Sequence, residues 1–544
     1  MIKHVALLFI FLSFLTSCMK GQKVDLIVHN AKIHVMDDAN SVFDAMAISD
    51  GKVVEVGAER QILNKYRSEE DIDALGKDVY PGLTDAHGHL LMYANQKLGV
   101  DLTGAKSMEE VIYRCEKYYA KSSNKFIVGG GWDQSLWPNE SMPNNLELSK
   151  VFKNIPVCLY RIDGHAALVN DFLVKKAKIT SNNVDGGEVK MEKGIPTGLL
   201  IDHAMNSISS FIPAYSQKQV KEAILEIQEE LFQYGITGTH EAGIENKHIK
   251  LFKSLVASGK LKLELYAMLL NSAENRSFAV KNGPYRYRNL SIRSFKVFAD
   301  GSLGSRGALL KKPYTDDHHS HGLLLTSVNE MRNVAQFCLK NGYQMNTHGI
   351  GDSANALILD IYKNAFKRNP DHRFRIEHSQ VIDPSDFAKF SDYAVFPSVQ
   401  PTHATSDQRW AEKRIGRERL VGAYAYKTLL SQYGMLAIGT DFPVESTNPF
   451  FTIHAAVQRK NQSNEPLKGF LAKEALSLEE VLRGMTIWAA FSSFQERELG
   501  SLEKGKKANF VIFSKPLESN PSFVQNYAWM TFIRGKKVFA LDEL

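Results

Sequence analysis

The chain has 544 residues, of which 44% are hydrophobic and 23% are charged, and its formal net charge is +6. This length is sufficient for a large barrel together with a smaller domain. The composition is that of a globular protein and excludes a largely disordered chain. Because the charge excess is small and no basic stripe is present, the sequence gives no reason to expect a nucleic-acid partner.

The first residues have the organisation of a secretory signal. Lys3 and His4 precede an apolar run from Val5 to Leu15, which is too short to remain as a membrane-spanning helix. Leu-Thr-Ser-Cys ends the run and resembles a bacterial lipobox, in which the cysteine (Cys18) is lipidated; a cysteine there by chance is the alternative. We therefore expect residues 1–18 to be a lipoprotein signal, and the mature protein to be exported, held to a membrane by lipid and facing the periplasm.

Both ends of the chain have the pattern of short β-strands. Residues 19–80 contain apolar runs separated by turn residues, including an Asp50-Gly51 pair of the kind that joins hairpin strands. Residues 496–544 contain similar runs. Since neither end has enough strands to enclose a core alone, we predict one small β-sandwich domain built from both chain ends.

The region between the two ends alternates strand-like and helical segments, which is typical of a parallel sheet wrapped by helices. Residues 217–234, for example, have the apolar spacing of a helix. We predict an α/β fold with a (β/α)8 TIM-like barrel that begins at 81–101 and continues over 215–495. The stretch 102–214 is too long for a simple barrel connection and is predicted to be an inserted subdomain that covers the barrel mouth.

A pair of histidines ends the first predicted barrel strand, in the run VYPGLTDAHGHL. Side chains alternate faces along a strand, so His87 and His89 point to the same side. Two imidazoles on one face at a strand end form half of a metal site. Two surface loop histidines are the alternative, and the strand context and the neighbouring Asp85 favour metal ligands.

Four further residues of metal-binding or catalytic type follow later apolar strands. In chain order they are Lys296, His348, His378 and Asp441. A single histidine after a strand is more often a hydrogen-bonded structural residue. However, the carboxyl ends of barrel strands form the active face of this fold, so we expect the four residues to converge with the histidine pair.

Longer motifs surround these residues: PGLTDAHGHL, GGWDQ (130–134), RIDGHA (161–166), KVFADGSLGSR (296–306) and QPTHA (400–404). Together they resemble the amidohydrolase superfamily, and within it the branch of YtcJ-like hydrolases and N-substituted formamide deformylases. The resemblance covers nearly the whole mature chain. It implies a metal-dependent barrel beside a small β-sandwich formed from both ends, in agreement with the fold predicted from the strand and helix pattern.

The resemblance also implies roles for the residues at the strand ends. The metal ligands on the first, fifth, sixth and eighth strands would be His87 with His89, His348, His378 and Asp441. Lys296 falls where many members carry a carboxylated lysine that bridges two metal ions. An unmodified lysine that pairs with Asp300 or with the substrate is the alternative. The implied cofactor is a divalent metal, in the first place zinc, as one or two ions.

Such a site suits hydrolysis of an unactivated C–N bond, because zinc lowers the pKa of bound water from 15.7 to about 7. Asp441 would act as the general base and then deliver the proton to the departing nitrogen. A metal ion, or His165 or His240 nearby, would polarise the carbonyl group and stabilise the developing oxyanion. A turn residue without a catalytic role is the alternative for Asp441, but its position after the last apolar strand favours catalysis.

Candidates for substrate binding lie in the predicted insert and in a glycine-rich segment: Trp132, Asp133, Gln134 and Arg306. Tryptophan-rich segments occur equally in packed cores. Arg306 could bind a substrate carboxylate through its planar guanidinium, or it could tie its loop to Asp300.

The sequence therefore predicts a metal-dependent hydrolase that cleaves a small amide, or a related non-peptide C–N bond, in a small-molecule substrate. An ester or phosphoester hydrolase on the same scaffold is one alternative. A lipoprotein that only binds a small ligand is another, and it predicts loss of the acidic base, yet Asp441 is present. The substrate, the number of metal ions and the oligomeric state, including a homodimer, stay open.

Overall fold

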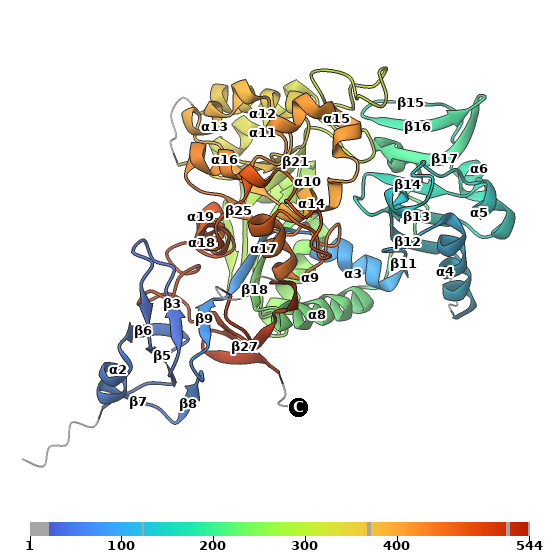
Figure 1. The fold of residues 1–544 in the computed structure, drawn as a ribbon. Helices are drawn as coiled ribbons and strands as arrows, with labels where there is room; N and C mark the ends of the chain where they lie inside the picture. Colours follow the sequence, from blue (N-terminus) through green and yellow to red (C-terminus); the bar gives the residue numbers. More distant parts are fainter. Residues whose placement is uncertain (1–20, 122–124, 367–370, 518–522, 542–544) are drawn as a thin grey trace, which may run out of the picture.

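The structure is a computed structural model that describes residues 21–121, 125–366, 371–517 and 523–541. The predicted lipidation site, Cys18, lies outside these residues. Within the described parts of the chain, none of the helices has the length and apolar character needed to cross a bilayer. Figure 1 shows a central barrel with a teal subdomain on one side and the blue N-terminal strands on another.

Eight parallel strands form the barrel, and they lie in the order in which they occur in the chain. They are β10 (Leu83–Gly88), β18 (Ile236–Ile244), β19 (Glu264–Leu270), β21 (Leu290–Phe298), β22 (Gln344–Gly349), β23 (Arg375–His378), β24 (Phe396–Val399) and β25 (Ala437–Ile438). The segment after β25 returns to β10 through backbone hydrogen bonds, from Asp441 N to His87 O (2.7 Å) and from His89 N to Phe442 O (2.8 Å). The predicted TIM-like barrel is confirmed.

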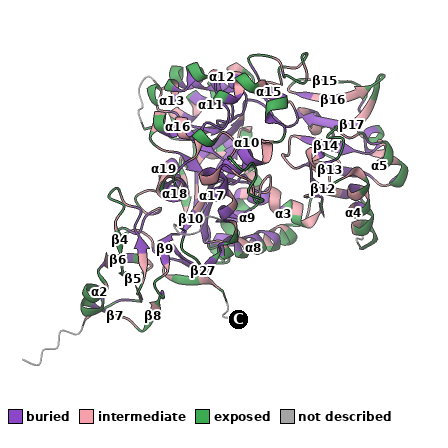
Figure 2. Ribbon diagram, viewed as in Figure 1, coloured by how far each residue is buried: buried purple, intermediate pink, exposed green. Residues whose placement is uncertain are grey.

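Helices surround the barrel, with buried inner faces and exposed outer faces (Figure 2). In α8 (Gln217–Gln233), Ser216 and Gln219 form a capping box that satisfies the first backbone amides. Ile227 and Leu231, one helical turn apart, are buried on its inner face. The other helices of this region are α3 (Leu90–Leu98), α9 (Asn246–Ala257), α10 (Ala273–Asn282), α11 (Val328–Asn341), α12 (Asp352–Ala365), α13 (Ala388–Asp392), α14 (Pro401–Asp407), α15 (Ala411–Arg419), α16 (Tyr426–Tyr433), α17 (Pro449–Gln458), α18 (Leu478–Gly484) and α19 (Ile487–Ser492).

The predicted insert is a separate mixed sheet of seven strands in the order β11-β12-β13-β14-β17-β16-β15. Its strands are β11 (Val100–Asp101), β12 (Ile127–Trp132), β13 (Val157–Arg161), β14 (Ala166–Val169), β15 (Asn183–Val184), β16 (Gly187–Glu192) and β17 (Ile195–Asp202). Leu199 and Ile201 belong to one apolar cluster and Leu200 to another, so both faces of this sheet are covered. The helices of the insert are α4 (Met108–Lys121), α5 (Leu146–Val151), α6 (Asp171–Lys176) and α7 (Asn206–Ser209).

The two chain ends share a β-sandwich. One sheet contains β6 (Lys52–Gly57), β5 (Ala45–Ser49), β2 (Leu26–His29) and β8 (Glu70–Asp73). The other contains β28 (Lys536–Ala540), β27 (Ala528–Ile533), β26 (Phe510–Phe513), β9 (Asp78–Pro81), β3 (Lys32–His34) and β4 (Val42–Phe43). The pairing of β26 with β9, in which Val511 lies opposite Tyr80, joins the C-terminal strands to the N-terminal ones. The prediction of a sandwich built from both ends is confirmed.

Candidate metal centre and active-site cavity

Three of the predicted strand-end residues form a tight cluster at the carboxyl end of the barrel. His87, His378 and Asp441 each offer one ligand atom, these atoms lie within 4.8 Å of one another, and all three residues are buried. His87 belongs to β10, His378 is the last residue of β23, and Asp441 follows β25. The sequence brings them together because the carboxyl ends of parallel barrel strands meet on one face.

The remaining strand-end residues surround this cluster. His89 Nε2 lies 3.1 Å from Asp441 Oδ1, and Lys296 Nζ lies 3.4 Å from His87 Nε2. The centroid of the His348 ring is 4.5 Å from the centroid of the His378 ring. All six residues that the sequence places at the strand ends are therefore neighbours.

A buried ion pair orients His87. Its Nδ1 lies 2.5 Å from Glu377 Oε2, and Arg375 contacts the same carboxylate through Nε (2.7 Å) and Nη2 (2.8 Å). Burial and the charge of Lys296 lower the pKa of His87 to about 4, so its ring is neutral at neutral pH. A neutral ring that donates from Nδ1 to a carboxylate presents Nε2 as a ligand atom, which is the usual arrangement around metal-binding histidines.

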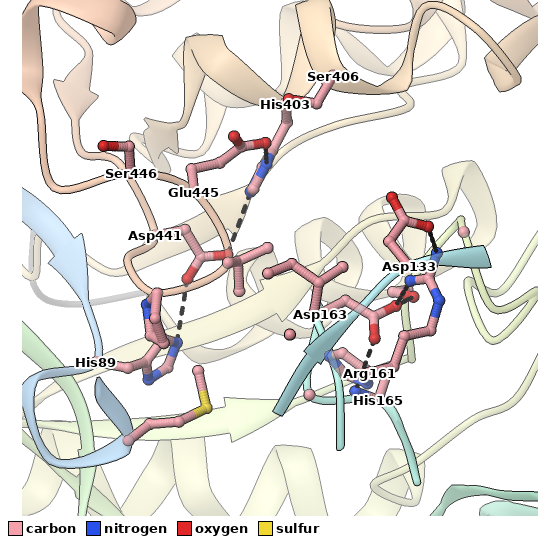
Figure 3. A pocket seen from close by; sticks show the side chains of 18 of the residues that line it. His89, Asp133, Arg161, Asp163, His165, His403, Ser406, Asp441, Glu445 and Ser446 are labelled. Atoms are coloured by element: carbon pink, nitrogen blue, oxygen red, sulfur yellow. Dashed lines mark hydrogen bonds and ion pairs between the residues drawn. The ribbon is translucent and has the colours of Figure 1, made fainter. Parts of the chain in front are cut away.

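A second histidine holds Asp441 from the other side. Asp441 Oδ2 lies 3.2 Å from His403 Nε2, and His403 Nδ1 lies 3.2 Å from Glu445 Oε1 (Figure 3). Burial opposes ionisation of Asp441, but the hydrogen bonds from His403 and His89 hold the pKa of its carboxyl group well below the usual range. Asp441 is therefore an ionised carboxylate that can accept a proton or bind a cation.

The side chain of Lys296 is buried beside this cluster. Burial lowers the pKa of Lys296 to about 8, although the carboxylates of Glu377 and Asp441 oppose the shift. A fraction of the amine is thus neutral near physiological pH and can act as a nucleophile. The alternative prediction of an ion pair with Asp300 does not match the contacts of that residue, whose carboxylate accepts the backbone amides of Leu309, Ile350 and Gly351.

A cavity of about 900 Å³ lies over these residues, and His89, Lys296, His348, His378 and Asp441 are part of its lining. Its opposite wall comes from the insert. Figure 3 shows Asp133, Arg161, Asp163 and His165 on that wall, facing Asp441, His403 and Glu445 of the barrel. A volume near the upper end of the range for small-molecule sites can hold a substrate larger than a simple formamide.

His165 is the histidine that the insert contributes to this cavity. It lies in the turn between β13 and β14, and its ring centroid is 5.1 Å from that of His348. Its Nδ1 lies 2.5 Å from Asp202 Oδ1. Burial alone would lower the pKa of His165, but the carboxylate of Asp202 outweighs it and raises this pKa to about 9. The ring therefore carries a positive charge at neutral pH.

The donor set fits a divalent metal ion. Imidazole nitrogens and carboxylate oxygens are typical ligands of zinc and of similar ions, and the arrangement of His87 on Glu377 is the one found around such ligands. An ion bound here would be held by His87, His378 and Asp441, with His89, Lys296 and His348 adjacent.

Comparison with known proteins gives the family. The family model described as "Amidohydrolase family" matches residues 70–539. The chain belongs to the amidohydrolase family. Two curated relatives are the putative amidohydrolase YtcJ of Bacillus subtilis, 28% identical over 89% of this chain and 93% of the relative, and the N-substituted formamide deformylase of Arthrobacter pascens, 25% identical over 91% and 94%. A solved metal-dependent hydrolase from Pyrococcus horikoshii is 26% identical, covers 92% of this chain and 99% of its own, and superposes with a TM-score of 0.75.

The protein is thus a metal-dependent amidohydrolase, a hydrolase that acts on C–N bonds, and the predicted resemblance is confirmed. Among the predicted substrate-binding residues of this amidohydrolase, Asp133 lines the cavity and pairs with Arg161 at 3.0 Å. Trp132 and Gln134 do not line it. Trp132 packs in the apolar core of the insert and donates to Leu159 O, and buried Gln134 accepts from Arg161 Nε. Trp132 and Gln134 are two residues apart, so in an extended segment their side chains lie on the same side, opposite to that of Asp133.

Two further predictions need correction in the same way. Arg306 does not contribute to the cavity lining; its guanidinium pairs with Asp316, through Nε at 3.1 Å and Nη2 at 3.0 Å. His240 is on β18 with 1% of its surface exposed, its ring is tilted against that of Tyr266, and its Nδ1 contacts Arg375 Nη1 at 3.0 Å. It therefore lies beneath the metal centre of the amidohydrolase, where it contributes to the buried network and not to substrate contact.

His403 and Glu377 were not assigned a role from the sequence. His403 belongs to the QPTHA motif after the seventh barrel strand, so the motif was a signal for it. Glu377 directly precedes the candidate ligand His378, and strand alternation alone would place the two side chains on opposite faces of the sheet. Its contact with His87 on another strand appears only in the folded amidohydrolase.

We expect Glu377→Gln to weaken metal binding by about 10- to 100-fold, the usual effect of removing a carboxylate that supports a ligand histidine. The amide keeps the size of the side chain but lacks the charge that fixes the His87 tautomer and neutralises Arg375. Titration of the metal-free protein with zinc, followed by calorimetry, measures the change. Glu496→Gln, at a carboxylate that pairs with Arg373 elsewhere, is the matched control. Equal zinc affinities in all three proteins would contradict the role of Glu377.

Proposed function

We propose that the protein hydrolyses the C–N bond of a small amide with bound zinc, and that Asp441 is the general base. The observation that carries this proposal is the buried cluster of His87, His378 and Asp441 at the base of a cavity of about 900 Å³. Nitrogen and carboxylate ligands in a compact buried site favour zinc over magnesium or calcium. The relative described as an N-substituted formamide deformylase supports an amide as the substrate.

The protein residues have distinct tasks in this reaction. A bound zinc ion supplies Lewis-acid chemistry, making water more acidic and polarising a carbonyl group. Asp441 Oδ1, on the side of the metal-binding histidines, takes the proton of the attacking water and passes it to the departing nitrogen. His403 keeps Oδ2 of the same carboxylate fixed. His165, positively charged and on the facing wall, stabilises the oxyanion that forms on the carbonyl oxygen.

The proposal includes a chemical modification of Lys296. Its lowered pKa, its burial and its 3.4 Å distance from His87 Nε2 favour reaction of the amine with CO₂. This reaction joins the Lys296 nitrogen to the carbon of CO₂ and releases one N–H proton to water. The carbamate is an anion where an ammonium group would repel a cation, so together with the neighbouring residues it would hold divalent metal ions. We therefore propose a carboxylated Lys296 and a binuclear centre.

The proposal extends to the location of the protein. Residues 1–18 have the three regions of a lipoprotein signal, with the lipidated cysteine at Cys18. The mature enzyme would be anchored by lipid outside the cytoplasm and would act on small molecules there. Metabolic labelling with a radioactive fatty acid tests this, because the wild type should incorporate label and Cys18→Ser should not.

A metal-removal experiment tests the activity. We expect chelation to abolish hydrolysis of 4-nitroformanilide and 4-nitroacetanilide, and zinc to restore it. Parallel assays with 4-nitrophenyl acetate and bis(4-nitrophenyl) phosphate address the ester and phosphoester alternatives. The proposal fails if the zinc-loaded enzyme cleaves an ester or phosphoester with a higher kcat/KM than every amide in the panel.

A further inference from the structure

Asp202, the last residue of β17, has a backbone conformation that L-amino acids rarely adopt. Its φ is 47° and its ψ is −121°, values that favour glycine. Residues held in such conformations are concentrated at functional sites, where the surrounding structure keeps them in place. Asp202 is also buried, with 6% of its surface exposed, although aspartate is among the residues that are least often buried.

The side chain of Asp202 makes one strong contact and leaves one oxygen without a partner. Oδ1 lies 2.5 Å from His165 Nδ1, and the backbone N–H of Asp202 donates to His165 O at 3.0 Å. Oδ2 is buried and has no hydrogen-bonding partner among the described residues. Both the strained backbone and the unpartnered oxygen disfavour the folded state, so packing alone does not account for an aspartate here.

The barrel accommodates this carboxylate with two glycines. A Cβ on Gly301 would lie 2.4 Å from Asp202 Oδ2, and a Cβ on Gly307 would lie 2.7 Å from the same atom. Both glycines belong to the loop after β21, which we call the glycine loop (residues 301–307). Any larger residue at either position would displace the aspartate.

The glycine loop also contacts the segment that carries His165. Ser302 Oγ donates to Asp163 Oδ2 at 2.5 Å, and Asp163 Oδ1 accepts the backbone N–H of His165 at 3.1 Å. Arg161, which pairs with Asp163, lies beside Gly304, where a Cβ would come within 3.1 Å of Nη1. The glycine loop of the barrel is therefore in direct contact with the turn 161–165 of the insert.

We propose that the glycine loop is a docking site for the insert, and that Asp202, docked there, is a positioning residue that directs His165 Nε2 toward the substrate carbonyl. Because Nδ1 is engaged by Asp202, Nε2 is the ring nitrogen left for the cavity that His165 lines. This inference rests on the proposed function, in which His165 stabilises the oxyanion. It also explains the glycine-rich sequence of residues 301–307 by contact with the insert, without substrate binding by Arg306.

Asp202→Gly separates positioning from stability. Glycine adopts the observed backbone angles without strain, so we expect the melting temperature to stay the same or rise. Loss of the carboxylate frees the His165 ring, and we expect kcat/KM for 4-nitroformanilide to fall about 100-fold or more, with zinc content unchanged. Asp202→Asn keeps an oxygen for Nδ1 and tolerates positive φ, so it should recover part of this loss.

Gly301→Ala tests the docking site from the barrel side. Its Cβ would collide with Asp202 Oδ2, so we expect a loss of kcat/KM comparable to that of Asp202→Gly. In the double variant with Asp202→Gly the collision with the carboxylate is absent and only the closer approach to Gly307 Cα (3.0 Å) remains, so Gly301→Ala should add little further loss. Gly57→Ala is the matched control, because a Cβ there meets its nearest neighbours at 3.7 Å.

Two results would overturn the proposal. One is Asp202→Gly with kcat/KM within about threefold of the wild type. The other is a melting temperature that falls together with zinc content, which would make Asp202 a structural residue. If the zinc-loaded wild type cleaves no amide at all, the proposed function fails, and crystal structures then decide the positioning role alone. A His165 ring that keeps its place in Asp202→Gly and Gly301→Ala refutes that role, and a displaced ring supports it.

Discussion

Asp441→Asn should lower kcat/KM for amide hydrolysis by at least about 1,000-fold, because it removes the proposed general base and a candidate metal-binding carboxylate together. Asparagine has nearly the same shape, and its carbonyl oxygen can still accept the hydrogen bond from His403 Nε2. The variant should therefore fold normally while its amide can no longer take a proton from water. Steady-state kinetics with 4-nitroformanilide and metal analysis of the same preparation measure both effects.

Asp392→Asn, at an exposed position at the end of α13, provides the control and should have wild-type kinetics. Zinc content distinguishes the two contributions of Asp441. A variant with full zinc content and low kcat has lost the base, whereas one with low zinc content has lost the ligand. If Asp441→Asn retains more than about one tenth of the wild-type kcat at full zinc content, Asp441 is not the base.

Lys296→Ala should lower the metal content from two equivalents per chain to one or none, and kcat should fall by about 100-fold or more. The physical reason is that a carboxylated Lys296 would supply anionic oxygens for metal binding, which alanine lacks. The truncated side chain leaves a space next to His87 that a small carboxylic acid can enter. Adding acetate or propionate should therefore restore part of the activity, and mass spectrometry of the native protein should detect the added CO₂.

Lys468→Ala, at an exposed lysine, is the matched control and should keep both metal content and kcat. A single equivalent of metal in the wild type and in Lys296→Ala would exclude the bridge and assign Lys296 to substrate binding. Without tightly bound metal in either protein, the proposed hydrolysis itself would be refuted.

The convergence of the candidate metal ligands could be predicted from the sequence because their positions follow from barrel geometry. His87, Lys296, His348 and His378 lie at or near the ends of apolar strands, and parallel strands bring those ends to one face whatever the intervening helices do. The sandwich could be predicted for a similar reason, since neither chain end has enough strands to enclose a core. Periodicity and turn residues are local signals that a sequence carries directly.

The rest depends on contacts between distant segments. Trp132 and Arg306 have side chains suited to substrate binding, but the packing of the insert and the position of Asp316 direct them elsewhere. The support of His87 by Glu377 and the contact of Asp202 with the glycine loop are also made between segments far apart in the sequence. Local sequence patterns do not indicate which buried polar groups from distant segments will contact each other.

The pairing of β9 with β26 affects how the protein reaches its native state after synthesis. The strand that must complete the sheet next to β9 is synthesised only after all eight barrel strands. Until then β9 has an open edge on that side, and such edges promote aggregation. A nascent chain would thus depend on chaperones to cover this edge.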